Sequence, residues 1–195
     1  RLLQQRQRDP RIRIVELSRN FGKDIALTAG LDHAAGRAVI PIDADLQDPP
    51  ELIPELVATW RQGYDVVYAK RRSRAADGWL KRTSARLFYG IFGALARTDM
   101  PRDTGDFRLL DRRVVDALAQ LPERNRFMKG LFAWVGFRQT GILYDRQPRH
   151  GGTSKWNYWR LWNYALDGMA AFSTLPLRIW TYLGLAVALW ALGYG

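Results

Sequence analysis

The chain has 195 residues, of which 47 % are hydrophobic and 12 % aromatic, so it can bury a core and is too apolar to be disordered. It contains no cysteine, which excludes disulfides, zinc–thiolate sites, iron–sulfur clusters and cysteine nucleophiles. The 30 basic residues against 19 acidic ones give a net charge of +11, which favours an anionic partner: nucleic acid, an anionic membrane or a phosphate-bearing substrate.

A strand, a loop and a helix are the first elements that we predict. The strongly basic segment 1–13 lacks the apolar region of a signal peptide and begins without Met, which indicates an internal fragment of a longer protein. Near-alternating polarity predicts a strand over 11–17. A polar loop over 18–22 precedes a helix that is expected over 23–35 and ends at Gly36.

Strands and helices then alternate along the chain. The apolar run 38–42 predicts a strand buried on both faces, and apolar side chains after Pro50 predict a helix that ends at Gly63. The next strand is expected over 65–69. This order predicts a parallel α/β sheet, whose ligands bind beyond the carboxyl ends of the strands.

The second half of the chain is predicted to contain further elements of both kinds. They are a helix from about 79 to 95, a polar turn over 102–108, a helix near 114–121, a strand over 137–146 and a glycine-rich basic loop over 149–155.

The C-terminal part is aromatic and then uncharged. Aromatic residues gather over 156–164 beside Arg160, as at a membrane interface. No charged residue follows Arg178, so the segment 179–195 is predicted to be a truncated transmembrane helix. A buried C-terminal helix is the alternative.

Two carboxylates directly follow the strand expected over 38–42. Asp43 and Asp45 are two residues apart, so an extended backbone presents both on the same side. Their hard oxygens suit Mg²⁺ or Mn²⁺ bound to nucleotide phosphates, and Gln47 can add an amide oxygen. A solvated acidic turn that caps the helix at Pro50 is the alternative.

Candidate phosphate-binding cations occur in two places. Four follow the strand 65–69, on the same rim as the carboxylates: Lys70, Arg71, Arg72 and Arg74. The loop that carries Arg149, Ser154 and Lys155 combines cations, hydroxyls and glycines, as a phosphate clamp does. A solvated basic face and the positive charge that flanks a membrane helix are the respective alternatives.

A third candidate carboxylate belongs to Thr104-Gly-Asp106-Phe107, within the predicted polar turn. Asp106 can act there as a general base, or it can orient an acceptor. Capping of the turn by this aspartate is the alternative.

Taken in order, these motifs resemble the family 2 (GT-A fold) glycosyltransferases. More narrowly they resemble the polyprenyl-phosphate glycosyltransferases, relatives of dolichyl-phosphate mannose synthase and of bacterial undecaprenyl-phosphate glucosyl and aminoarabinose transferases. The resemblance is carried by residues 18–23, 43–50, the region of Arg71 and Arg74, 103–108, 125–130 and 149–156. The first strand of the family, with its Val-x-x-Pro-x-x-Asn-Glu pattern, is missing, as expected of an N-terminally truncated fragment.

The resemblance implies a fold, a domain organisation and a reaction. The fold is α/β: a GT-A (Rossmann-like), mostly parallel sheet flanked by helices. The domains are a catalytic domain over 1–155, an amphipathic juxtamembrane segment over 156–178 and a truncated transmembrane helix over 179–195. The reaction is inverting transfer of a sugar from a nucleotide-sugar, expected to be a UDP-sugar, to a polyprenyl phosphate such as undecaprenyl phosphate. It takes place at the cytoplasmic face of the bacterial inner membrane.

The resemblance also implies roles for individual residues. Mg²⁺ or Mn²⁺ is held by Asp45 with help from Asp43 and Gln47, and it neutralises the departing diphosphate. Asp106 is the base or orients the acceptor, whose phosphate is already largely anionic at neutral pH. Donor or acceptor phosphates are bound by Asp43, Arg71, Arg74, Arg149, Ser154 and Lys155.

Two other functions compete with this interpretation. A basic nucleic-acid-binding module explains the charge but leaves the acidic motif and the hydrophobic C-terminus unexplained, so no nucleic-acid partner is expected. A membrane-anchored scaffold without activity disagrees with the intact Asp43-Ala-Asp45 motif. The enzyme is expected to act at a membrane, and a homo-oligomer is compatible with the sequence.

Overall fold

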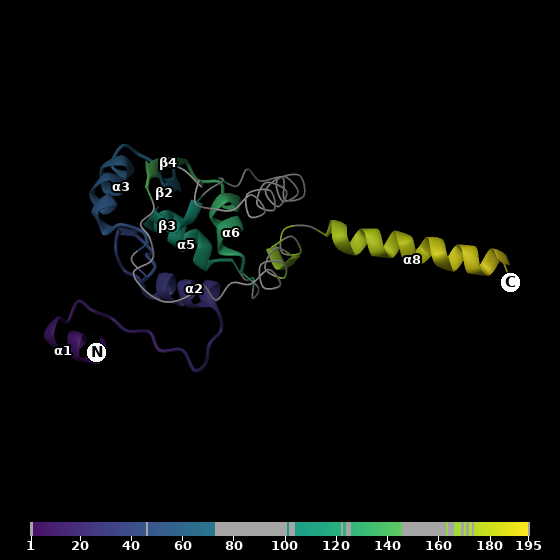
Figure 1. Ribbon diagram of the computed structural model, residues 1–195, viewed down its shortest axis with the longest axis horizontal. Coiled ribbons are helices and arrows are strands. Elements are labelled where there is room, and N and C mark those ends of the chain that lie inside the picture. Colours follow the sequence, from purple (N-terminus) through teal and green to yellow (C-terminus); the bar gives the residue numbers. More distant parts are fainter. Residues whose placement is uncertain are drawn as a thin grey trace.

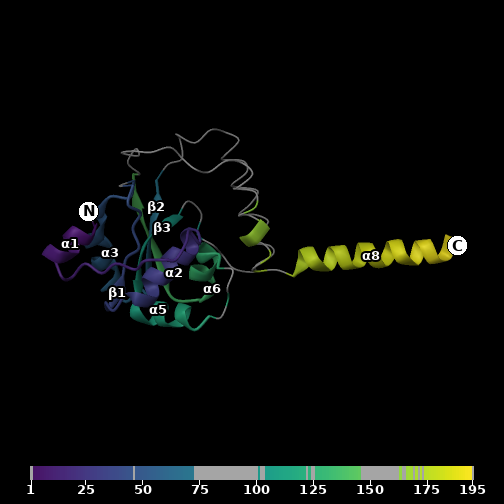
Figure 2. The same ribbon diagram turned by 90° about the horizontal axis from the view of Figure 1, so that it is seen from below.

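A computed structural model describes residues 2–45, 47–72, 101, 104–121, 123, 126–145, 163, 166–168, 170, 172 and 174–194 of the chain. These residues form an α/β body, and a C-terminal helix projects away from it in both views (Figures 1 and 2). The helix predicted near 79–95, the loop 149–155 and the aromatic segment 156–162 lie outside the described residues.

The body is built on a four-stranded mixed sheet with the strand order β1-β3-β2-β4. Its strands are β1 (Ala38–Val39), β2 (Val66–Arg71), β3 (Thr104–Asp111) and β4 (Gln139–Tyr144). β2 and β4 are parallel, whereas β3 runs antiparallel to both β1 and β2. The α/β class is confirmed. Of the four described strands, β1, β2 and β4 point the same way and β3 runs against them, so the sheet is mixed because β3 is inserted in the opposite direction.

The strand β3 occupies most of the segment that was predicted to be a polar turn over 102–108. The charged residues Asp106 and Arg108 interrupt the apolar sequence, so hydropathy did not predict a strand there. In the fold Arg108 is buried with only 3 % of its surface exposed, and Asp106 lies in the site described below. Charged side chains are therefore part of the sheet interior here, which a polar sequence does not predict.

Helices cover both faces of the sheet (Figure 1). They are α2 (Lys23–His33), α3 (Ile53–Trp60) after the 3₁₀ turn η1 (Pro50–Leu52), α5 (Arg112–Ala119) and α6 (Met128–Trp134); α1 (Leu2–Arg8) lies at the N-terminus and α8 (Leu175–Tyr194) at the C-terminus. The helices predicted at 23–35, after Pro50 and near 114–121 are confirmed.

The core consists of two clusters, one on each face of the sheet. Successive residues of β2 point to opposite faces: Val66 packs with α2, α5 and α6, and Val67 packs with α3 and β4. Burial of each such side chain contributes about 1.5–3 kcal/mol. The two clusters hold the sheet rigidly between helices, and the strand ends are left to carry the site.

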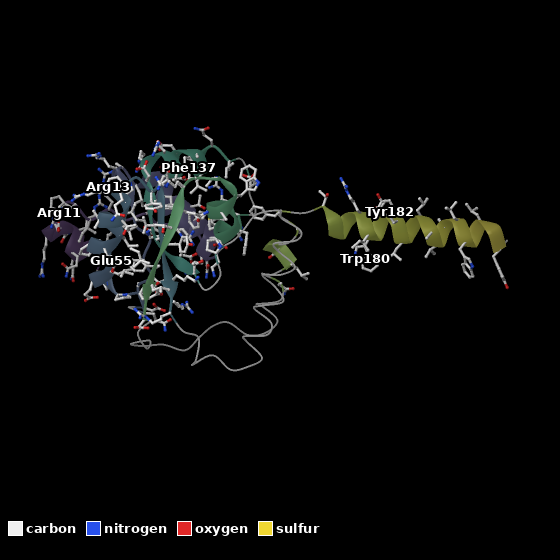
Figure 3. The ribbon with its side chains drawn as sticks, turned by 90° about the horizontal axis from the view of Figure 1, so that it is seen from above. Arg11, Arg13, Glu55, Phe137, Trp180 and Tyr182 are labelled. Carbon is white, nitrogen blue, oxygen red and sulfur yellow. The ribbon has the colours of Figure 1, made fainter. Side chains whose placement is uncertain are left out.

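Two predicted strands differ from the structure. Residues 12–17 form no strand, because no described strand lies beside them to supply ladder hydrogen bonds. The side chains of this segment still alternate in solvent exposure: Arg11 and Arg13 point outward (Figure 3), whereas Ile12 and Ile14 are half-buried. The strand expected over 38–42 shortens to β1 and is half-buried instead of being covered on both faces.

The predicted transmembrane helix is also corrected. α8 is helical over 20 residues, but the part of the chain that the structure describes contains no helix both long and apolar enough to cross a membrane. Along α8, Trp180 and Tyr182 are strongly exposed (Figure 3).

Candidate functional site

The predicted site residues converge at one end of the sheet. Asp43 lies in the loop that follows β1, and Arg71 ends β2. Because β3 is antiparallel to β2, its first residue, Thr104, pairs with Lys70 near the carboxyl end of β2. Asp106, the third residue of β3, is therefore brought to the same end of the sheet as Asp43. We call this end the carboxylate edge.

Lys23 joins the two carboxylates. Its Nζ donates a hydrogen bond of 2.7 Å to Oδ2 of Asp43 and lies 2.6 Å from Oδ2 of Asp106. Lys23 is the first residue of α2, so the contact also connects this helix to the sheet. Lys23 had no predicted role in the site. It belongs to the motif 18–23, and that membership is the only signal in the sequence that points to it.

Cations surround Asp106 and keep it ionised. Burial raises the pKa of this carboxyl, but the nearby ammonium groups of Lys23 and Lys129 and the guanidinium of Arg108 outweigh burial, so its pKa is lowered. Oδ1 of Asp106 is buried and has no hydrogen-bond partner among the described residues. The carboxylate therefore has a buried oxygen to which a ligand can donate.

The two cations behind Asp106 come from elements that the sequence analysis did not assign to the site. Arg108 follows on β3; it donates from Nη2 to the carbonyl oxygen of Gly105 at 2.7 Å, and its guanidinium lies 4.1 Å from the ring centroid of Phe132. Lys129 lies in the first turn of α6, where burial lowers its pKa against the attraction of Asp106. Positive charge therefore exceeds negative charge around this carboxylate, as in an anion site.

The loop after β1 that carries Asp43, Asp45, Gln47 and Asp48, here called the acidic loop, presents the ligands that were predicted for a metal ion. Asp43, Asp45 and Gln47 are all half-buried, and the backbone N–H of Gln47 donates to Oδ1 of Asp45 at 3.2 Å. Among the described residues, no group of three or more His, Cys, Asp or Glu side chains can hold a metal ion. These donors fit a Mg²⁺-type ion that takes one or two protein carboxylates and fills its other positions with substrate phosphates and water.

A buried tyrosine fastens this loop to the sheet. The hydroxyl of Tyr144, at the end of β4, donates to Oδ1 of Asp48 at 2.5 Å, and Asp48 is only 4 % exposed. Burial and this hydrogen bond raise the pKa of Tyr144 to about 12, against the opposing effect of Arg71. Arg71 pairs with Tyr144 in the parallel ladder, and its buried Nε has no hydrogen-bond partner among the described residues. Tyr144 carried no sequence signal beyond its place in a predicted strand.

The remaining predicted phosphate-binding residues are Arg74, Arg149, Ser154 and Lys155, and they lie outside the described residues. Their roles stay predictions. The structure thus brings together Asp43, Asp106 and Arg71 from the predicted set, and it adds Lys23, Lys129, Arg108 and the Asp48–Tyr144 pair.

The comparisons with known proteins agree with this geometry. The family described as glycosyl transferase family 2 matches residues 1–119. Over 188 residues the chain is 63 % identical to a Synechocystis protein described as uncharacterized glycosyltransferase sll0501, covering 96 % of the chain and 59 % of that protein. It is 51 % identical over 187 residues to the bactoprenol glucosyl transferase of Shigella phage SfV and to a prophage bactoprenol glucosyl transferase homolog of Escherichia coli K12, covering 96 % of the chain and 61 % of each. The chain thus spans about three fifths of the length of these relatives.

Proposed function

The chain belongs to glycosyl transferase family 2, and we propose that it forms the catalytic part of an enzyme that transfers one sugar from a nucleotide-sugar to a polyprenyl phosphate. The observation that carries this proposal is the convergence of Asp43 and Asp106 on the ammonium of Lys23 at one end of the sheet, with Lys129 and Arg108 beside Asp106. We expect a UDP-sugar as donor and undecaprenyl phosphate as acceptor. Relatives named bactoprenol glucosyl transferases make glucose the first sugar to test.

The donor is placed on the acidic loop. Asp45, with Asp43 and Gln47, would hold Mg²⁺ or Mn²⁺, which supplies positive charge to the diphosphate as it leaves. Arg71 lies at the same edge, and its buried Nε has no hydrogen-bond partner among the described residues, so it can donate to a phosphate oxygen. The hydrogen bond from Tyr144 to Asp48 ties the acidic loop to the end of β4.

The acceptor is placed on the side of Asp106. One oxygen of its phosphate attacks the anomeric carbon, and the bond from that carbon to the diphosphate oxygen breaks on the opposite face, which inverts the configuration. The phosphate has a second pKa of about 6 and is mostly dianionic at neutral pH, so the attacking oxygen carries no proton that a base must remove. An ionised Asp106 cannot donate a hydrogen bond to a phosphate dianion, so it orients the acceptor through the cations around it: Lys23, Lys129 and Arg108 attract the charge of the phosphate.

The other predicted phosphate ligands complete this proposal. Arg74, Arg149, Ser154 and Lys155 would bind donor or acceptor phosphates from segments that flank the described strands. The enzyme would act at the cytoplasmic face of the bacterial inner membrane, where a polyprenyl acceptor is held. Large apolar side chains exposed along α8, including Trp180 and Leu192, support association with that membrane.

The reaction is tested on the full-length parent protein. It is incubated with undecaprenyl phosphate, Mg²⁺ and a panel of sugar nucleotides, and the lipid is analysed by mass spectrometry. We expect the mass of one hexose to be added from one donor, and we expect the Asp45→Asn variant to give no product. Asp32→Asn, an exposed carboxylate on α2, serves as the matched control with normal turnover. If no donor modifies the lipid, the proposed reaction is wrong.

A further inference from the structure

The position of Lys23 is fixed by the loop before it. Gly22 adopts φ +91°, a left-handed conformation that favours glycine, and its N–H donates to Oδ1 of Asn20 at 3.0 Å. A Cβ at Gly22 would meet no atom within 4 Å, so backbone conformation and not crowding selects glycine there. This turn sets the position at which α2 begins, and Lys23, the first residue of α2, thereby lies at the carboxylate edge.

The two contacts of Lys23 differ in how firmly the partner is held. The Asp106 side chain is only 12 % exposed, whereas that of Asp43 is 37 % exposed and lies on the acidic loop. The Lys23 side chain itself is 49 % exposed, which leaves its long stem room to rearrange. Its contact with Asp106 is therefore the anchored one, and its contact with Asp43 is the one that a ligand can displace.

A divalent cation on the acidic loop competes with this ammonium. Oδ2 of Asp43, which accepts the Lys23 hydrogen bond, belongs to the carboxylate that we expect to assist metal binding. Two cations on one carboxylate repel each other, so Lys23 weakens the binding of a bare ion. A nucleotide diphosphate brings negative charge that compensates both cations, which removes the penalty.

We propose that Lys23 is a positioning residue that makes cation binding at Asp43 depend on the donor and that then remains on Asp106, beside the acceptor. This inference rests on the proposed function, because the donor and the cation are those of the proposed reaction. It goes further by assigning an order: the cation enters together with the nucleotide diphosphate, and its entry releases Lys23 from one carboxylate to serve the other.

The inference is tested by Mn²⁺ binding to the full-length protein, measured by electron paramagnetic resonance without any turnover. Without nucleotide, Lys23→Gln is expected to bind Mn²⁺ about thirtyfold more tightly than wild type, since one positive charge about 4 Å from a doubly charged ion in water weakens binding on this scale. With UDP present, the difference between the two proteins should shrink. The tighter binding should accompany slower sugar transfer.

Three variants act as controls. Lys23→Arg keeps the charge and should bind Mn²⁺ as wild type does. Arg61→Gln removes an exposed cation beyond the end of α3 and should change nothing. Lys23→Met provides a second neutral variant in case Lys23→Gln does not fold, as judged by circular dichroism.

Two results would overturn the inference: a neutral variant that binds Mn²⁺ no more tightly than wild type, or no Mn²⁺ binding by any of these proteins even with UDP. Because the measurement needs no sugar transfer, it is separate from the test of the proposed function. A Mn²⁺ shift in a protein that modifies no polyprenyl phosphate would support the role of Lys23 and refute only the acceptor.

Discussion

The two ends of the central sheet carry similar charged residues but use them differently. At the end opposite the carboxylate edge, Asp111 accepts hydrogen bonds from Trp60 Nε1 at 2.7 Å and from the backbone N–H of Arg113 at 3.0 Å. The Arg113 guanidinium also pairs with Asp65, and Arg112 donates to the carbonyl oxygens of Ala34 and Gly36. These charges are matched by neighbours, and they fasten α5 to the sheet.

At the carboxylate edge the matching is incomplete. Several cations face one ionised Asp106, and buried polar atoms of Asp106 and Arg71 have no hydrogen-bond partner among the described residues. Buried polar groups without partners cost about 1–3 kcal/mol each, so a fold retains them where a ligand supplies the missing bonds. At the opposite end the amide oxygen Oε1 of Gln139 also lacks a partner among the described residues, but the charged groups there are paired. The difference between the two ends is therefore one of charge: the carboxylate edge holds charged groups with unsatisfied buried atoms, which a charged ligand can satisfy.

The largest effect is expected from Asp45→Asn. The change removes a ligand charge where the diphosphate accumulates charge, and loss even of groups that only support a metal ligand costs about 10–100-fold. Turnover of the full-length enzyme should therefore fall at least about 100-fold, with the melting temperature preserved. Near-normal turnover of the variant, or of wild type in excess chelator, would show that turnover does not depend on a metal ion at Asp45.

Asp106→Asn comes next, and its pH dependence separates two roles. Since cations lower the pKa of Asp106, it stays ionised from pH 6 to 9. Loss of an orienting contact should slow turnover about 100-fold at every pH in this range, because misplacement of a reacting group costs this much. A base worth about 10²–10⁴ would give a defect that shrinks as the acceptor phosphate loses its last proton. A mutant-to-wild-type ratio that climbs steeply with pH would restore the base.

Tyr144→Phe is expected to have an intermediate effect, because the Asp48 carboxylate loses its donor while the ring stays in place. An unsatisfied buried group of this kind costs about 1–3 kcal/mol of unfolding free energy. The acidic loop loosens, so the KM for the donor should rise while the KM for the acceptor stays constant. Tyr64→Phe, at the opposite end of β2, is the matched control. Equal changes in both KM values would contradict a role confined to the donor loop.

The smallest effect is expected at the end of the sheet opposite the carboxylate edge, which holds Asp65, Asp111, Arg112 and Arg113 and is here called the matched end. Asp111 caps α5, and Asp111→Ala should cost about 1 kcal/mol of unfolding free energy. Burial raises the pKa of Asp111, but hydrogen bonds from Arg113 and Trp60 lower it overall. The stability from this lowered pKa is present above the unfolded value of 3.8 and is lost as the pH falls through the folded value. Thermal unfolding of wild type and variant should thus converge below about pH 4; a difference that grows there would reverse the sign.

Apolar periodicity predicted the elements that pack the core. The helix after Pro50 and the strand at 65–69 follow patterns of apolar side chains, and the structure confirms them. It also confirms the helix predicted at 23–35, which ends before Gly36, and the strand predicted over 137–146. The pattern failed for α6, because Met128–Trp134 is buried almost all round and shows no amphipathic stripe. The apolar pattern also cannot predict strand direction, because the order of elements along the chain does not fix whether β3 runs parallel or antiparallel to its neighbours.

The site was predictable only where a motif marked it. Asp43 and Asp106 were found as short acidic motifs, and the structure places both on Lys23. Lys23 and Tyr144 were missed because their roles exist only through partners far along the chain: Lys23 meets Asp106, and Tyr144 meets Asp48. Contacts of this kind depend on the packed sheet and leave no periodic pattern in the sequence.

The central claim is that sugar transfer takes place at the carboxylate edge and not at the matched end. Both ends of β3 carry an aspartate, so Asp106→Asn and Asp111→Asn compare them on one strand. The measurement is turnover of undecaprenyl phosphate by each full-length variant, well below its melting temperature. We predict turnover reduced about 100-fold for Asp106→Asn, as for other misplaced reacting groups, and near wild type for Asp111→Asn. Normal turnover of Asp106→Asn, or an equal loss in both variants, would contradict the account.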